Sequence, residues 1–239
     1  MKERIIRPEK NERNKTYRGR INMKKDLIIL GTAHLDTTPG KCSPDGKFRE
    51  AVWSREFVGD LKPMLESYGL EVMIDWPDLS MGKGITTSQE LKKRVEIVNK
   101  ESAKKDQNVY YISTHVNAAG SQGNWLGARG WSVYTSPGRT ISDTLAEFLW
   151  ISAHKNLRTY RNLGTWGKNQ VPIRSDTTDG DHDLEERLYV LTKTKCPAVL
   201  VENMFQDNHD DVSYLTSDIG FHELSRTYVE GILWFLDNR

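Results

Sequence analysis

The chain has 239 residues, of which 37% are apolar and 28% are charged, and its net charge is +1. This length suits one α/β domain with a buried core, and no run approaches the roughly eighteen apolar residues of a membrane span. The near-neutral charge gives no electrostatic case for nucleic-acid binding. Two distant cysteines, Cys42 and Cys196, exclude a disulfide scaffold and fit a reducing compartment.

The N-terminal segment differs from the rest of the chain. Residues 1–22 hold eight Lys or Arg and three Glu, a net +5, and are poor in apolar side chains. We therefore expect a disordered basic arm there. Contact with an anionic polymer or lipid is one interpretation. A solvated tail, or an extension upstream of a start at Met23, is the interpretation we favour, because short basic termini are common.

From residue 23 onward, apolar β-rich runs alternate with helical patterns. This predicts a single α/β domain over 23–239, with a central mixed or mostly parallel sheet and helices on both faces. The expected strands are 27–30, 70–74, 109–112, 131–134 and 198–201. The first expected helix begins at Glu50, the next two cover 88–104 and 142–156, and the last carries Leu224, Tyr228, Ile232 and Leu236. The expected loops are 75–87, 117–130 and 158–182. Pro63 lies within the first helical pattern, where it should kink or end the helix.

Three of these strands are followed by a residue that binds metal or transfers protons. His34 follows the first strand, His115 the third and Glu202 the last. In open α/β sheets the loops at the carboxyl ends of the strands converge on one crevice. These three side chains are therefore expected to meet in space.

Glu50 is a fourth candidate, at the start of the first helix. It shares a face with Trp53, Phe57 and Leu61, which should be buried. A buried carboxylate is costly unless it is paired or bound to a cation. The alternative is an N-terminal carboxylate stabilised by the helix dipole, but two nearby histidines favour the metal ligand.

Two histidines and one carboxylate form a catalytic zinc set that leaves the fourth position open. His34, Glu50 and His115 are therefore the predicted Zn²⁺ ligands. Such chemistry also needs a free carboxylate to take a proton from water and pass it to the leaving nitrogen. Glu202 fits that task, and its alternative is a structural partner for an arginine or a backbone amide.

The chain resembles the zinc-dependent N-acetylmuramoyl-L-alanine amidases over about residues 26–237. The matching segments, in order, are Ile29–His34, Arg49–Ser54, Ile112–Ala118 and Cys196–Phe205 with Asn208 and Asp211, besides smaller matches at Arg94, Ser142 and Leu145–Ala146. The resemblance implies hydrolysis of the amide between N-acetylmuramic acid and L-alanine in bacterial peptidoglycan, with Glu202 as general base and acid. The family's glycine-rich loop is replaced here by Leu35–Asp36 after the histidine, and Asn203–Met204 replaces the small residues after the glutamate, which affects substrate positioning more than metal binding.

Two interpretations besides a wall amidase stay open at this point. One is a zinc peptidase or amidohydrolase acting on soluble peptides or acyl amino acids, and the other is a catalytically silent wall-binding module. Substrate-binding residues are not identified by the pattern, and Asn117 and His209 are the only candidates. Because no apolar signal segment is present, we expect synthesis in the cytoplasm without a signal peptide and action on the wall after release or delivery, as for an endolysin or a secreted effector.

Overall fold

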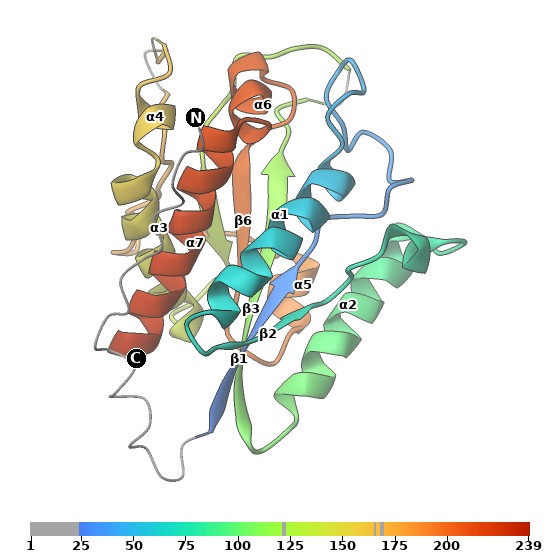
Figure 1. The fold of residues 1–239 in the computed structure, drawn as a ribbon, viewed down its shortest axis with the longest axis vertical. Coiled ribbons are helices and arrows are strands. Elements are labelled where there is room, and N and C mark those ends of the chain that lie inside the picture. Colours follow the sequence, from blue (N-terminus) through green and yellow to red (C-terminus); the bar gives the residue numbers. More distant parts are fainter. Residues whose placement is uncertain (1–23, 121–122, 165, 168–169) are drawn as a thin grey trace, which may run out of the picture.

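The computed structural model describes residues 24–120, 123–164, 166–167 and 170–239, which form a six-stranded sheet covered by helices (Figure 1). The predicted basic arm, 1–22, lies outside the described residues. The strands are β1 (Lys25–Gly31), β2 (Glu71–Ile74), β3 (Gln107–Asn117), β4 (Ser132–Thr135), β5 (Leu184–Glu185) and β6 (Ala198–Phe205). Their order is β2-β1-β3-β6-β4-β5, in which the first four strands are parallel and β4 runs antiparallel to β6. The predicted mixed, mostly parallel sheet is confirmed.

Helices cover both faces of this sheet, as predicted. They are α1 (Glu50–Glu66), η3 (Leu79–Gly82), α2 (Thr87–Ser102), α3 (Ile141–Asn156), α4 (Arg158–Arg161), α5 (Tyr189–Lys193), α6 (His209–Leu215) and α7 (Asp218–Asn238). Buried side chains of α1, α3 and α7 form one apolar core with the sheet, and those of α2 and α5 form a second, smaller core on the other face. None of the described helices is long and apolar enough to cross a bilayer.

Two loop predictions were wrong, and of the two outcomes expected at Pro63, a kink or an end of the helix, the end is not found. The first helix includes Pro63 and continues to Glu66. Leu61 and Leu65, on either side of Pro63, are fully buried, so their packing outweighs the missing backbone donor. The expected loops 75–87 and 158–182 contain the short helices η3 and α4, whose four-residue lengths leave no periodic pattern to detect.

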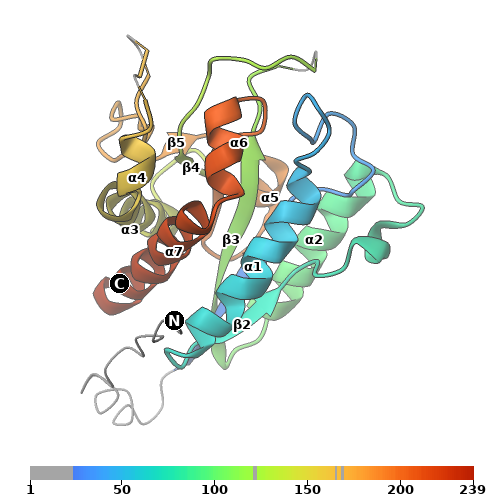
Figure 2. The same cartoon turned by 45° about the horizontal axis from the view of Figure 1, so that its top comes forward.

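Parallel pairing brings the sequence-distant ends of β1, β3 and β6 together. Leu30 pairs with Ile112 in the register of β1 and β3, and His115 lies directly opposite Glu202 in that of β3 and β6. The loop before α1, the tip of β3 and α6 lie at the same end of the molecule in both views (Figures 1 and 2). The sheet therefore delivers its strand-end residues to one edge.

A buried charge cluster supports this edge from the α2 side. The Arg94 guanidinium donates to Asp75 at 2.7 Å and to Glu90 at 2.8 Å, and all three residues are buried. Tyr111 and Thr32 complete the cluster, with the Tyr111 hydroxyl donating to Asp75 at 2.9 Å. Because Arg94 is the shared donor, its loss would leave two buried carboxylates without their cation.

Replacement of Arg94 by leucine should therefore destabilise the fold by about 3–5 kcal/mol, the usual cost of breaking a buried ion pair on one side. Urea unfolding monitored by circular dichroism measures this difference. Lys93→Leu, an exposed neighbour on the same helix, is the matched control and should change stability by less than about 0.5 kcal/mol. Equal stabilities of the two variants would contradict the assignment of Arg94 as the central cation.

Candidate active site

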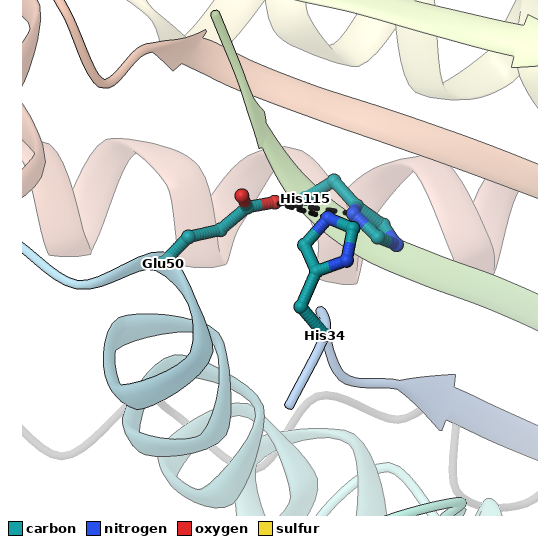
Figure 3. A group of neighbouring side chains, drawn as sticks. All are labelled: His34, Glu50 and His115. Atoms are coloured by element: carbon teal, nitrogen blue, oxygen red, sulfur yellow. Dashed lines mark hydrogen bonds and ion pairs between the residues drawn. The ribbon is translucent and has the colours of Figure 1, made fainter. Parts of the chain in front are cut away.

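His34, Glu50 and His115 form a cluster at the carboxyl edge of the sheet (Figure 3). Glu50 Oε1 lies 3.1 Å from His115 Nδ1 and 3.5 Å from His34 Nε2. Each residue offers one ligand atom, and these atoms lie within 4.8 Å of one another. The three predicted ligands therefore lie together, although His34 comes from the loop after β1, Glu50 from the start of α1 and His115 from the end of β3.

The Glu50 carboxylate is completely buried. Its Oε1 accepts a hydrogen bond from the Val116 backbone amide at 3.0 Å, whereas its Oε2 has no hydrogen-bond partner among the described residues. Lys41 Nζ lies 4.0 Å from Oε2. A buried carboxylate with an unsatisfied oxygen costs free energy, so this environment suits a bound cation better than a structural side chain.

Both imidazoles are in the form that binds metal. Burial lowers the pKa of His34 and of His115 to about 3, so both rings are neutral near pH 7. His115 Nε2 lies 3.1 Å from the Ser113 hydroxyl. When the ring proton resides on Nε2 and is donated to Ser113, the Nδ1 lone pair faces Glu50, an arrangement typical of metal-ligating histidines. The His₂Glu donor set fits zinc.

The backbone at this edge adopts conformations that non-glycine residues rarely take. His34 has φ 43° and Met204 has φ 62°, and no other described non-glycine residue has a positive φ. Arg55 donates to the His34 carbonyl at 2.9 Å and to the Ala33 carbonyl at 2.8 Å. Strained backbone of this kind costs about 1–3 kcal/mol per residue and clusters at functional sites, where surrounding contacts hold it.

Glu202 lies beside the cluster on β6, opposite His115. Its Oε2 is covered and has no hydrogen-bond partner among the described residues. Burial, and next the charge of Glu50, raise the pKa of Glu202 well above its ordinary value, while the positive charges of Lys41 and Arg174 act in the opposite direction. A buried carboxyl group with a raised pKa is suited to proton transfer.

The two weaker candidates have other contacts. Asn117 ends β3, and its side-chain oxygen accepts from the Ala118 amide at 2.8 Å. His209 begins α6 and stacks on Trp125 with ring centroids 3.6 Å apart. No contact of either side chain with the cluster appears among the described residues, so their substrate-binding role stays a prediction.

Sequence reasoning missed several residues that support the cluster. Arg55 and Ser113 orient the two histidines, and Asn203 donates to the His115 carbonyl at 3.1 Å. Lys41 reaches Glu50 from the loop before α1. Ser113 and Asn203 lie in segments that match the family, and Ser113 is two residues from His115 on β3. No sequence pattern points to Lys41 and Arg55, because they act through contacts with residues that are not their neighbours in the sequence.

A family model described as N-acetylmuramoyl-L-alanine amidase matches residues 28–233 of this sequence. The chain belongs to the N-acetylmuramoyl-L-alanine amidase family. The match covers every residue of the cluster together with Glu202. Membership of this family identifies the chain as an N-acetylmuramoyl-L-alanine amidase. No curated protein sequence matches the chain closely enough to count as a relative.

Solved amidase structures share the fold of this family member. An N-acetylmuramoyl-L-alanine amidase from Clostridium difficile 630 superposes with a TM-score of 0.69 at 19% identity, covering 91% of this chain and all (100%) of its own. The catalytic domain of the amidase CwlV from Bacillus (Paenibacillus) polymyxa var. colistinus gives 0.63 at 20% identity, covering 90% and 99%. The catalytic domain of an endolysin targeting Clostridia difficile gives 0.59 at 20%, covering 88% and 97%.

The depressed histidine pKa values predict how the metal-free amidase responds to acid. The unfolded chain binds a proton at each histidine near pH 6.5, whereas the folded chain does so only near pH 3. Stability contributed by the neutral rings is thus full above pH 6.5 and is lost as the pH falls from 6.5 toward 3. Each histidine should lower the folding equilibrium constant about tenfold per pH unit in that window.

Urea unfolding of chelator-treated protein between pH 7.5 and 4.5 tests this expectation. His115→Gln should show a pH slope smaller by about one proton than the parent, because one of the two titrating rings is gone. His222→Gln replaces a histidine of α7 that lies outside the cluster and should keep the parental slope. An unchanged slope in His115→Gln would contradict a neutral, buried His115.

Proposed function

We propose that this amidase is zinc-dependent and hydrolyses the amide bond between N-acetylmuramic acid and L-alanine in peptidoglycan. The observation that carries the zinc assignment is the buried Glu50 carboxylate, whose Oε1 faces both histidines while its Oε2 has no hydrogen-bond partner among the described residues. Two neutral imidazoles and one carboxylate oxygen supply three ligands, the number found in catalytic zinc sites. His34, Glu50 and His115 would hold the ion.

Zinc bound there would polarise the scissile carbonyl and make a water molecule more acidic. Glu202 would then accept a proton from the attacking water and deliver it to the amide nitrogen as the carbon–nitrogen bond breaks. The products are the lactyl carboxylic acid of the muramic acid and the free amino group of L-alanine. Arg55 and Ser113 serve this reaction by holding the two histidines in place.

The metal assignment predicts that Glu50→Ala loses zinc. Purified parent protein should contain about one zinc per chain, and chelation should abolish hydrolysis until zinc is returned. The variant should bind zinc much more weakly and should no longer gain thermal stability from added zinc, because a ligand stabilises only the state that binds it.

Elemental analysis measures the zinc content of the monodisperse protein, and melting temperatures with and without zinc measure the stabilisation by the metal. Glu56→Ala, an exposed glutamate on the same helix, should retain the metal and the zinc-induced stabilisation. Full activity of a metal-free preparation would refute the zinc mechanism.

The second glutamate should behave differently. Glu202→Gln keeps the size of the side chain but cannot take the proton, so it should retain zinc and thermal stability while turnover falls by about 10²- to 10⁴-fold. Digestion of purified sacculi followed by end-group analysis measures turnover, since an amidase creates free L-alanine amino groups without new reducing sugar ends.

Glu186→Gln, at an exposed position, is the matched control and should digest sacculi at the parental rate. Parental turnover by Glu202→Gln would contradict the assigned role. Hydrolysis of small peptides but not of sacculi would instead identify a soluble-peptide amidohydrolase, and wall binding without any hydrolysis would identify a binding module.

A further inference from the structure

Lys41 places an ammonium group at the rim of the cluster. Its Nζ lies 4.0 Å from Glu50 Oε2, and its side chain is 33% exposed, whereas that of Glu50 is fully buried. Its charge also acts on His34, His115 and Glu202, and it opposes the rise in the Glu202 pKa. Lys41 is therefore next to Glu50, the carboxylate of the cluster, and is also accessible from solvent.

The loop that carries Lys41 is fixed at several points. The Glu50 amide donates to the Lys41 carbonyl at 3.2 Å, and Cys42 pairs with Arg49 in an antiparallel bridge. Gln206, four residues after Glu202, donates to the Gly40 carbonyl at 2.8 Å. The lysine backbone is thus tied both to the metal-ligand helix and to the segment that carries the general base.

The positive charge of Lys41 is paired only as long as Glu50 keeps its full negative charge. Its ion pair with Glu50 is the only one it makes among the described residues. Once Glu50 coordinates a divalent ion, its negative charge is offset, and the attraction between Glu50 and Lys41 weakens. The partly exposed ammonium group then has no other anionic partner among the described residues, which favours a substrate that brings its own negative charge.

The chemistry of the substrate restricts where that charge lies. The lactyl carboxyl of muramic acid is consumed in the scissile amide, and its acetamido group is neutral, so the sugar side offers no anion. On the peptide side, the residue after L-alanine, a D-glutamate, carries an α-carboxylate unless it is amidated. We propose that Lys41 is a specificity-determining residue that recognises this free carboxylate and makes the enzyme prefer non-amidated stem peptides. This inference rests on the proposed amidase function.

Two soluble substrates that differ in one group test the proposal: N-acetylmuramoyl-L-alanyl-D-glutamate whose γ-carboxyl is blocked as a methylamide, and the α-carboxamide of the same compound. The parent enzyme should prefer the acid by about tenfold in kcat/KM, mainly through KM, because a hydrogen bond to a charged group is lost in the amide. Lys41→Met should reduce this preference to near unity, and Lys41→Arg should restore most of it. Lys47→Met, in the same loop with a side chain that is 86% exposed, should keep the parental preference.

Binding measured without turnover provides an independent readout. In the zinc-loaded Glu202→Gln background, calorimetry should show about tenfold tighter binding of the acid than of the amide, and Lys41→Met should remove the difference. The proposal is overturned if Lys41→Met keeps the preference, or if only Arg174→Met, which removes the other cation acting on Glu202, abolishes it. If the zinc-loaded parent hydrolyses neither these compounds nor purified sacculi, the proposed amidase function fails, and the binding comparison still decides the role of Lys41.

Discussion

The buried Glu50 carboxylate imposes the constraint on which the rest of the site depends. A charged group with no exposed surface needs compensation, and here one backbone amide satisfies only one of its two oxygens. The nearest side chains are two neutral imidazoles and a partly exposed lysine. Such a combination is poorly stabilised by the protein alone, and a divalent cation held there would also stabilise the fold.

The remainder of the carboxyl edge acts as a rigid support for this group. His34 holds a left-handed backbone conformation because Arg55 binds its carbonyl from one side. The Arg94 guanidinium, fixed by Asp75 and Glu90, reaches the same carbonyl at 3.4 Å. Two buried arginines therefore fix the position of the first histidine, and the energetic cost of the strained backbone is met by contacts far from it in sequence.

A second set of contacts positions Glu202 relative to His115. His115 and Glu202 are neighbours because β3 and β6 pair in parallel, and Asn203 joins the strands further by donating to the His115 carbonyl and to the Tyr228 hydroxyl. The sequence departure at Asn203–Met204 is thus accommodated by a specific hydrogen-bond arrangement. The site therefore places two imidazoles and a buried carboxylate, a donor set suited to a divalent cation, beside a second carboxyl group.

The sequence by itself determined the parts that depend on periodicity and strand ends. The alternation of apolar runs and helical patterns predicted the α/β sheet with helices on both faces, and the positions of His34, His115 and Glu202 after buried strands predicted where they would meet. Glu50 was identified because the other residues on its face of the helix are apolar, and a carboxylate buried with them is unfavourable unless it is paired or bound to a cation. Short helices such as α4 escaped prediction because four residues are too few to show a period.

Only the tertiary structure decided which residues complete the site. Lys41 and Arg55 act through distances of a few ångströms between residues that are not neighbours in the sequence, and no local pattern encodes such contacts. The same holds for the left-handed conformation of His34 and Met204, which local propensity disfavours and which persists because surrounding hydrogen bonds outweigh it. The burial that makes both imidazoles neutral is likewise a property of the packed sheet edge and not of the residues alone.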